Sequence, residues 1–353
     1  MSPARRPGPV PRPAAVLLPT TVIGSYPVPE WLGQLRNDYY QGRISQAYLD
    51  EIHEMAIKAA LLDQERAGLD IVSDGELRRD NDIDYLLSRI PGIDIPRRDK
   101  ADYFDYYDAR VSSELPGPGD QGLGLDADFR FIARLTDLPV KLSLTGPFSL
   151  SRRISNAAYP DSADLVRALA RLLGAEAARL ALAGARYLQI DEPFLAGYPE
   201  AVGLAIEAIN IVTEGASVNW TLHVCYGNRY ARPLWAGHYD FLFPAVSKAK
   251  VDQLALEFAR TGDDDLRLLE QHQWDRCLGL GVIDVKSEQV ESADLVAARI
   301  RRALRFVAPA NLAVNPDCGL RHLPPQIARA KLAAMVSGAA LVRAELEGKG
   351  AEN

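Results

Sequence analysis

Short apolar runs alternate with longer amphipathic segments from residue 20 to the end of the chain. The short runs are rich in β-branched residues and stop at Gly, Pro, Asn or an acidic residue, which is typical of strands. The longer segments repeat apolar residues every three or four positions, which is typical of helices. We predict strands at 20–27, 69–76, 140–144, 187–190, 219–226, 253–258, 278–285 and 312–315. We predict helices at 45–67, 162–183, 200–213, 292–306 and 325–345.

This alternation predicts an α/β fold. Eight strands that alternate with helices or helix-like connections close most simply as a (β/α)8 TIM barrel, with a doubly wound open sheet as the main alternative. From about Asp94 to Asp128 the periodicity fails while Tyr, Asp, Gly and Pro accumulate. We expect an inserted excursion after the second strand there, of the kind that often covers an active site. Residues 1–19, rich in Pro and Arg, are expected to form a disordered leader ahead of one barrel domain at 20–353.

The composition is that of an ordinary soluble protein, with 48% hydrophobic and 25% charged residues. A net charge of -7 gives no reason to expect nucleic acid or an anionic membrane as a partner, since either would favour a basic face. The three cysteines are too few, and odd in number, for a disulfide framework, which indicates a reducing, cytoplasmic location. Their thiols are therefore available to bind a metal.

Residues capable of chemistry gather at the ends of the predicted strands. They are Ser25, Glu76, Thr145, Asp191, Glu192, His223, Cys225, Glu257, Asp284, Lys286, Asp317 and Cys318. In a barrel of parallel strands these ends meet at one rim, where the active site lies. The pattern therefore predicts an enzyme whose site is built from several strands.

Two of these residues suggest half of a zinc site. His223 and Cys225 are two positions apart on one predicted strand, so both side chains project from the same face. Glu257 and Cys318, each at the tail of an apolar run, offer the other half, and such a mixed set suits the tetrahedral shell of zinc. The alternative is that the cysteines are small buried hydrophobes and His223 is a core histidine with its hydrogen bonds satisfied.

The motifs at the strand ends resemble those of the catalytic barrel of the cobalamin-independent methionine synthase family. The resemblance runs in order from about Thr20 to the end of the chain. Its motifs are Ile23-Gly24-Ser25-Tyr26-Pro27, Asp74-Gly75-Glu76, Thr145-Gly146-Pro147, Gln189-Ile190-Asp191-Glu192-Pro193, His223-Val224-Cys225, Glu257 and Asn315-Pro316-Asp317-Cys318-Gly319-Leu320. The combination is far more specific than any single motif.

The resemblance implies an S-methyltransferase of the 5-methyltetrahydropteroyltriglutamate-homocysteine type that uses Zn²⁺. The metal ligands that it implies are His223, Cys225, Glu257 and Cys318. Zinc would lower the cost of forming the substrate thiolate, which then attacks the methyl group. Glu257 is the natural candidate to leave the metal during turnover, because a carboxylate is the least tightly held of the four ligands.

The same resemblance implies how the substrate is held. Asp191 and Glu76, with the backbone from Ile23 to Ser25, would bind the ammonium and carboxylate of homocysteine, or of another small thiol. Beyond the zinc pair, Tyr226 and Asn228 are expected to line the substrate pocket.

Three departures from the family pattern concern the methyl donor. The 353-residue chain is expected to lack the second barrel that helps to bind folate, and Phe148 to Arg153 lacks the later aromatic residue that would stack on the pterin. Lys286 stands where the family usually has a histidine thought to assist proton transfer, and we assign it a catalytic or anion-binding role. The donor is therefore predicted to be either a methylcorrinoid protein or methyl-folate.

Two other functions remain as alternatives. Epoxyalkane:coenzyme M transferases resemble the same barrel, and in them a zinc thiolate opens an epoxide; Lys286 could then pair with the sulfonate of coenzyme M. A protein of another class would use the barrel only to bind a corrinoid or a thiol, without catalysis. The full set of four potential ligands argues against such a scaffold.

Overall fold

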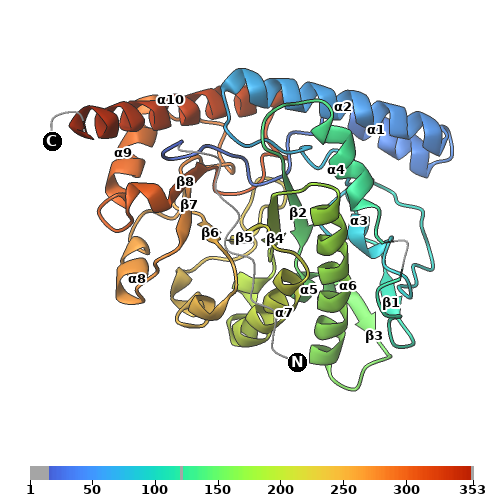
Figure 1. The fold of residues 1–353 in the computed structure, drawn as a ribbon. Coiled ribbons are helices and arrows are strands. Elements are labelled where there is room, and N and C mark those ends of the chain that lie inside the picture. The colour runs from blue at the N-terminus through green and yellow to red at the C-terminus, as the bar shows by residue number, and fades with distance from the viewer. Residues whose placement is uncertain (1–15, 120–121, 351–353) are drawn as a thin grey trace.

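Six parallel strands form the main sheet of the computed structural model, which describes residues 16–119 and 122–350 (Figure 1). Along the sheet the order is β2-β4-β5-β6-β7-β8. These strands are β2 (Lys141–Thr145), β4 (Tyr187–Asp191), β5 (Asn219–Val224), β6 (Gln253–Leu256), β7 (Cys277–Gly281) and β8 (Leu312–Asn315). All six were predicted, with ends that differ by a few residues.

Two further segments close the sheet into a ring. Thr20 pairs with Val314 of β8, and the next residue, Thr21, pairs with Ile71. Val72 then pairs with Val140, immediately before β2. The ring therefore has eight members, which makes the fold a (β/α)8 barrel and excludes the open sheet.

The two closing segments are shorter than the predicted strands at 20–27 and 69–76. Each forms only isolated bridges. The backbone leaves the extended conformation at Gly75, with φ of 66°, and at Glu76, with φ of 54°, so it cannot continue as a strand. In the first segment, Pro27 lacks the N–H that a ladder requires.

Helices surround the ring, as the amphipathic segments predicted. The long helices are α1 (Glu30–Tyr40), α2 (Gln46–Ala67), α6 (Ser162–Leu182), α7 (Val202–Glu214), α9 (Ala293–Ala303) and α10 (Pro325–Gly350). Shorter ones are α3 (Asp84–Leu87), α4 (Leu125–Ala133), α5 (Pro147–Ser151) and α8 (Leu266–Gln271), with 3₁₀ turns at Leu195–Gly197, Pro199–Ala201, Tyr239–Leu242, Ala245–Lys248 and Pro309–Asn311. The five predicted helices are confirmed, and α10 packs against α9 and α2 (Figure 1).

Helix α2 shows why its limits could be predicted. The hydroxyl of Ser45 accepts a hydrogen bond from the N–H of Tyr48 at 3.2 Å, which caps the first turn. At the other end Gly68 adopts a left-handed conformation with φ of 82°, a common way to terminate a helix.

The predicted excursion contributes one strand of a small second sheet and a covering segment. Strand β1 (Ala109–Val111) pairs in parallel with β3 (Ile154–Asn156). This two-stranded sheet lies at the edge of the barrel, beside α6 (Figure 1).

The predicted leader at 1–19 needs a correction at its end. Leu18 is fully buried, and the guanidinium of Arg343 on α10 donates to the carbonyls of Leu17 and Leu18 at 2.7 and 2.9 Å. Residues 16–19 therefore belong to the folded barrel, because the buried side chain of Leu18 and the partly buried guanidinium of Arg343 hold them there. Residues 1–15 lie outside the described part of the chain.

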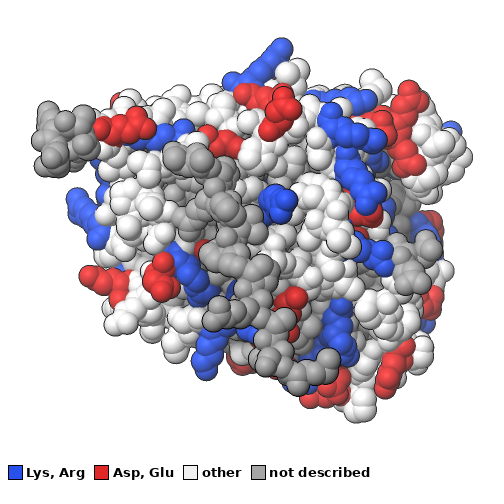
Figure 2. All heavy atoms as spheres, viewed as in Figure 1, with Lys and Arg blue, Asp and Glu red and all other residues white. Residues whose placement is uncertain are grey.

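The outer surface carries both signs of charge. Figure 2 shows acidic and basic side chains interspersed over the face that it presents. Within residues 16–119 and 122–350, no helix has the length and apolar content needed to cross a membrane.

Candidate active site

A cavity of about 110 Å³ lies at the carboxyl ends of the barrel strands. Most of the residues predicted for the site line it: Ile23, Ser25, Glu76, Asp191, His223, Cys225, Asn228 and Cys318. They come from five segments that are far apart in sequence, so the closing of the barrel is what brings them together.

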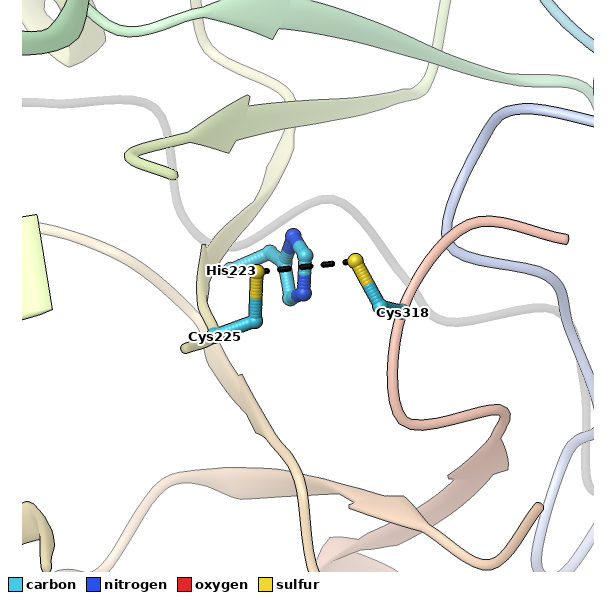
Figure 3. A group of neighbouring side chains, drawn as sticks. All are labelled: His223, Cys225 and Cys318. Carbon is cyan, nitrogen blue, oxygen red and sulfur yellow. Dashed lines mark hydrogen bonds between the residues drawn. The ribbon is translucent and has the colours of Figure 1, made fainter. Parts of the chain in front are cut away.

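Three of these side chains form a group suited to a metal ion. One ligand atom each from His223, Cys225 and Cys318 lies within 4.8 Å of the others, and the two sulfur atoms are 3.5 Å apart. His223 and Cys225 belong to the β5 segment, while Cys318 comes from the loop after β8 (Figure 3). Two thiolates bound to one tetrahedral zinc lie ~3.8 Å apart, so the observed spacing fits this metal.

The imidazole of His223 is oriented as a metal ligand would be. Its Nδ1 lies 2.8 Å from Oδ1 of Asp191, which also accepts a hydrogen bond from Gln189 Nε2 at 2.6 Å. The other ring nitrogen, Nε2, is buried and has no hydrogen-bond partner among the described residues. A carboxylate on one nitrogen and a metal on the other is the usual arrangement of a ligating histidine.

Charge in this group favours a thiolate on one sulfur. The pKa of the Cys318 thiol lies well below its ordinary value because of the hydrogen bond with Cys225, and His223 and Lys286 add to the effect. The pKa of Cys225 is raised well above its ordinary value by the same sulfur neighbour and by burial. Burial lowers the pKa of His223, but Asp191 and Cys318 outweigh it and raise that pKa to about 10. Near neutral pH, Cys318 is therefore a thiolate, whereas a bound metal ion would have to displace the protons of His223 and Cys225.

The predicted fourth ligand, Glu257, is not part of the three-residue group. Its buried carboxylate is 2.7 Å from the ammonium of Lys286 and 3.3 Å from Nη2 of Arg260. Burial raises the pKa of this carboxyl group, and Lys286 opposes that effect. Glu257 is therefore paired with cations at one side of the group.

Asp317 holds Glu257 and Cys318 in register. Its carboxylate accepts hydrogen bonds from the N–H groups of Phe258, Ala259 and Arg260 at 2.9 to 3.0 Å. The loop after β6 is thus tied to the loop after β8, directly beside both side chains.

Three predicted site residues do not line the cavity: Glu257, Lys286 and Tyr226. The side chain of Lys286 is only 3% exposed and its ammonium is paired with Glu257, so its predicted catalytic or anion-binding role stays a prediction. Tyr226 packs its ring against Tyr239, with centroids 5.0 Å apart. It lies one residue beyond Cys225, and successive side chains of an extended chain point to opposite faces.

Two motif glycines, Gly24 and Gly319, lie so close to other side chains that a larger residue would collide with them. A Cβ atom on Gly24 would collide with Oε1 of Glu76, and one on Gly319 would collide with Oγ of Ser25. Glu76 is itself held by the hydroxyl of Ser143 and by Arg79 Nη1 at 3.4 Å. The motif glycines thus allow the loops to meet at the cavity.

Several cavity residues were not predicted from the sequence. They are Asp82, Phe104, Tyr106, Arg229 and Arg321. Arg79 and His322 also line the cavity, and the place of His322 shortly after Cys318 is a weak signal in the sequence. The position of Arg79, three residues after the predicted strand end at Glu76, is a partial indication that it belongs to the site. Arg79 is buried and donates a hydrogen bond to the carbonyl of Ser143 at 2.7 Å. Phe104 and Tyr106 gave no signal, because the excursion has no periodicity.

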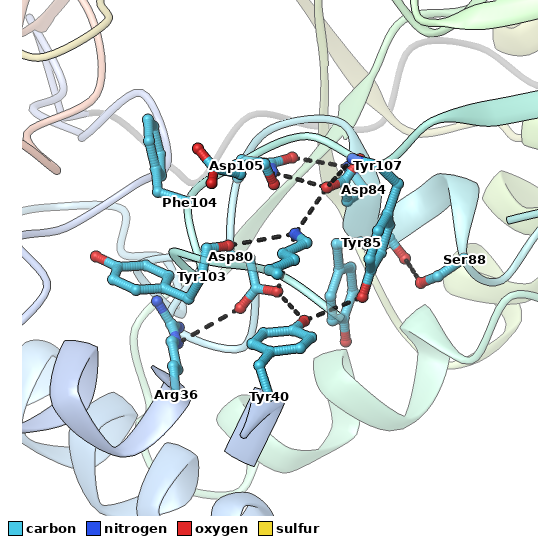
Figure 4. Close-up of polar contacts among 12 residues, drawn as sticks. Arg36, Tyr40, Asp80, Asp84, Tyr85, Ser88, Tyr103, Phe104, Asp105 and Tyr107 are labelled. Carbon is cyan, nitrogen blue, oxygen red and sulfur yellow. Dashed lines mark hydrogen bonds and ion pairs between the residues drawn. The ribbon is translucent and has the colours of Figure 1, made fainter. Parts of the chain in front are cut away.

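A buried lysine fixes the excursion over the site. The ammonium of Lys100 lies 2.7 Å from Asp84 Oδ2 and 3.4 Å from Asp80 Oδ2, and it also donates to the carbonyl of Tyr103 at 3.2 Å. Figure 4 shows the surrounding network, in which Asp80 also meets Arg36 and Tyr40. Phe104, the next residue along, lines the cavity. The anchor therefore positions the cavity wall.

Lys100→Met is expected to lower the free energy of unfolding by about 3–5 kcal/mol, because it leaves the carboxylate of Asp84 buried without its partner. Urea unfolding followed by circular dichroism measures this loss. Lys58→Met is the matched control: Lys58 forms an exposed pair with Glu54 at 3.9 Å, which is worth ~0–1 kcal/mol. Equal losses in the two variants would show that Lys100 is not an anchor.

Comparison with known proteins gives matches over almost the whole chain. The family model described as "Cobalamin-independent synthase, Catalytic domain" matches residues 18–341. A protein of Saccharolobus islandicus called methionine synthase is 36% identical over 335 residues, which cover 95% of this chain and 97% of that protein. A methionine synthase of Sulfolobus acidocaldarius is 35% identical over 338 residues, 96% of each chain.

Solved structures agree with the barrel. A B12-independent methionine synthase from Shewanella sp. W3-18-1, in complex with selenomethionine, superposes with a TM-score of 0.82 at 28% identity; the match covers 94% of this chain and all of that one. A methyltransferase from Methanosarcina mazei has a TM-score of 0.62 at 13% identity, over 93% of this chain and 95% of that one, and is similar in fold alone.

Proposed function

Because the chain belongs to the cobalamin-independent methionine synthase family and is an S-methyltransferase of that type, we propose that it methylates the sulfur of homocysteine with the help of zinc. The observation that carries the proposal is the group of His223, Cys225 and Cys318 beside the carboxylates of Asp191 and Glu76 in one cavity. A thiol-activating metal and an ammonium-binding surface would thus adjoin each other.

His223, Cys225 and Cys318 would hold the zinc. The unpartnered Nε2 of His223 and the two neighbouring sulfur atoms supply three donors of the types that zinc prefers. When bound, zinc favours the thiolate form of a substrate thiol near neutral pH. Asp191 supports the site from outside by fixing the imidazole through Nδ1.

We propose that Asp191 and Glu76 bind the ammonium of homocysteine. Both carboxylates line the cavity. Ser25 would bind the substrate carboxylate together with the backbone from Ile23, and Asn228, which donates to the carbonyl of Gly319 at 2.9 Å, also lines the cavity. This arrangement directs the thiol toward the sulfur atoms of the metal site.

Glu257 stays our proposed fourth zinc ligand, with Lys286 as its positioning residue. The 2.7 Å ion pair gives Lys286 a definite partner, so it would hold the carboxylate at the edge of the site rather than touch substrate. Glu257 would be the ligand that gives way to a substrate thiol, and Lys286 would then hold its carboxylate. Lys286 thus differs from the histidine that is usual at this position. The lysine stays positively charged beside Glu257, whereas a histidine can lose its proton near neutral pH.

The methyl donor is proposed to approach over Phe104 and Tyr106. Arg229 lies across both rings, with its guanidinium carbon 5.3 and 4.7 Å from their centroids, and Arg321 lines the same mouth. An anionic, partly aromatic donor such as methyl-folate fits these groups, and a methylcorrinoid protein is the second possibility. The protein would act in the cytoplasm, where thiols such as Cys225 and Cys318 stay reduced.

X-ray absorption at the zinc edge tests the proposal. The purified protein should contain one equivalent of zinc with a two-sulfur shell, which becomes a three-sulfur shell when L-homocysteine is added. Coenzyme M is the matched thiol without an ammonium, and its sulfonate would meet the carboxylates of Asp191 and Glu76, so it should leave the shell unchanged. A response to coenzyme M alone, or protein without stoichiometric zinc, would overturn the assignment.

A further inference from the structure

A second and larger cavity, of about 320 Å³, lies at the opposite end of the barrel. Its walls are apolar and include Leu17, Leu69, Leu138 and Leu312. It is also lined by Lys141, Asn219 and Gln253, the first residues of β2, β5 and β6. Within residues 16–119 and 122–350, no residue lines both this cavity and the active site. The volume falls in the range of small-molecule sites.

Lys141 points into the barrel at this end. It shares a face of β2 with Ser143, which bonds Glu76, and with Thr145, which lines the active site two layers above. Lys141 is 4% exposed, and no hydrogen bond or ion pair joins its ammonium to any part of the chain that the structure describes. Burial lowers the pKa of this amine to about 8, against the attraction of Asp191 and Glu76.

An ammonium buried without a partner is costly, so a counter-ion is expected. Among the described residues that line the cavity, Asp70 carries the only carboxylate, and it already accepts from Thr20 at 2.7 Å and pairs with Arg343 at 2.5 Å. The neighbouring amides of Asn219 and Gln253 add donors that an anion can use. The apolar walls of the same cavity suit a hydrocarbon body.

We propose that this cavity binds a small molecule with an anionic head and an apolar body, of the medium-chain carboxylate class, whose head pairs with Lys141. The site is separate from methyl transfer, because the layer of side chains that includes Ser143 and Gln189 lies between the two cavities. Neither the chemistry nor the residues of the proposed active site require it.

Isothermal titration of the full-length, zinc-loaded protein with octanoate tests the proposal. Octanoate should bind at one site, whereas acetate, without the body, and 1-octanol, without the head, should bind at least about tenfold more weakly. Lys141→Met should weaken octanoate binding by at least about tenfold. Lys248→Met, which changes an exposed lysine, should leave it unchanged.

A second variant keeps the test independent of how well Lys141→Met folds. Leu138→Trp adds bulk to the wall, at a half-buried position that does not hold the ammonium, and should also abolish octanoate binding while homocysteine binding persists. Absence of binding to the unaltered protein, binding that survives both variants, or competition between octanoate and homocysteine would each overturn the proposal.

Discussion

Replacing Cys318 with alanine is expected to remove zinc and to slow methyl transfer to homocysteine by roughly a thousandfold or more, since a metal site contributes several kcal/mol to such a step. Cys318 supplies one of the two sulfur atoms that lie 3.5 Å apart, and its pKa already favours the thiolate. Without it, His223 and Cys225 are left as a two-ligand site, which binds zinc too weakly to survive purification. Zinc content by elemental analysis and the rate of methionine formation measure the two losses.

Cys277→Ala is the matched control for this prediction. Cys277 is also buried, but it begins β7 and is not a member of the metal group. The same change of side chain there should keep one equivalent of zinc and near-normal turnover. If instead the Cys318 variant retains zinc and activity, the metal site lies elsewhere. In a separate experiment, treating the unaltered protein with a chelator should abolish its activity, and adding zinc should restore that activity.

The sequence predicts those parts of the site and fold that depend on residues close together in the chain. His223 and Cys225 could be paired from their spacing alone, since strand geometry puts alternate residues on one face. Cys318 could be joined to them only through the barrel, which sets the ends of β5 and β8 around one rim. The cap at Ser45 and the glycine at position 68 likewise fixed α2, because these signals act locally.

The sequence does not predict side-chain contacts between residues that only tertiary packing brings together. The ion pair between Lys286 and Glu257 joins side chains 29 residues apart, and no local pattern says that a lysine will meet a carboxylate rather than a substrate. Phe104 reaches the cavity only because Lys100 anchors the excursion to Asp84. Such contacts depend on the three-dimensional path of an aperiodic segment, which spacing cannot supply.

Asp191→Asn is expected to damage both halves of the site at once. The change keeps the size of the side chain but removes its charge, so the homocysteine ammonium loses one carboxylate partner. It also weakens the hydrogen bond that orients Nδ1 of His223, and loss of such a partner typically costs 10–100-fold in metal affinity. We therefore expect a higher KM for homocysteine together with weaker zinc binding, measured by steady-state kinetics and by competition with a zinc chelator.

Glu76→Gln separates the two effects. Glu76 lines the same cavity and is proposed to bind the same ammonium, but its contacts are to Ser143 and Arg79, not to His223. This variant should raise KM for homocysteine by about tenfold or more, as expected for the loss of one charge-assisted hydrogen bond, while zinc affinity stays unchanged. If both variants lower zinc affinity equally, Asp191 does not act through His223. If neither changes KM, the ammonium is bound elsewhere, and the two carboxylates serve only to hold the loops of the barrel mouth.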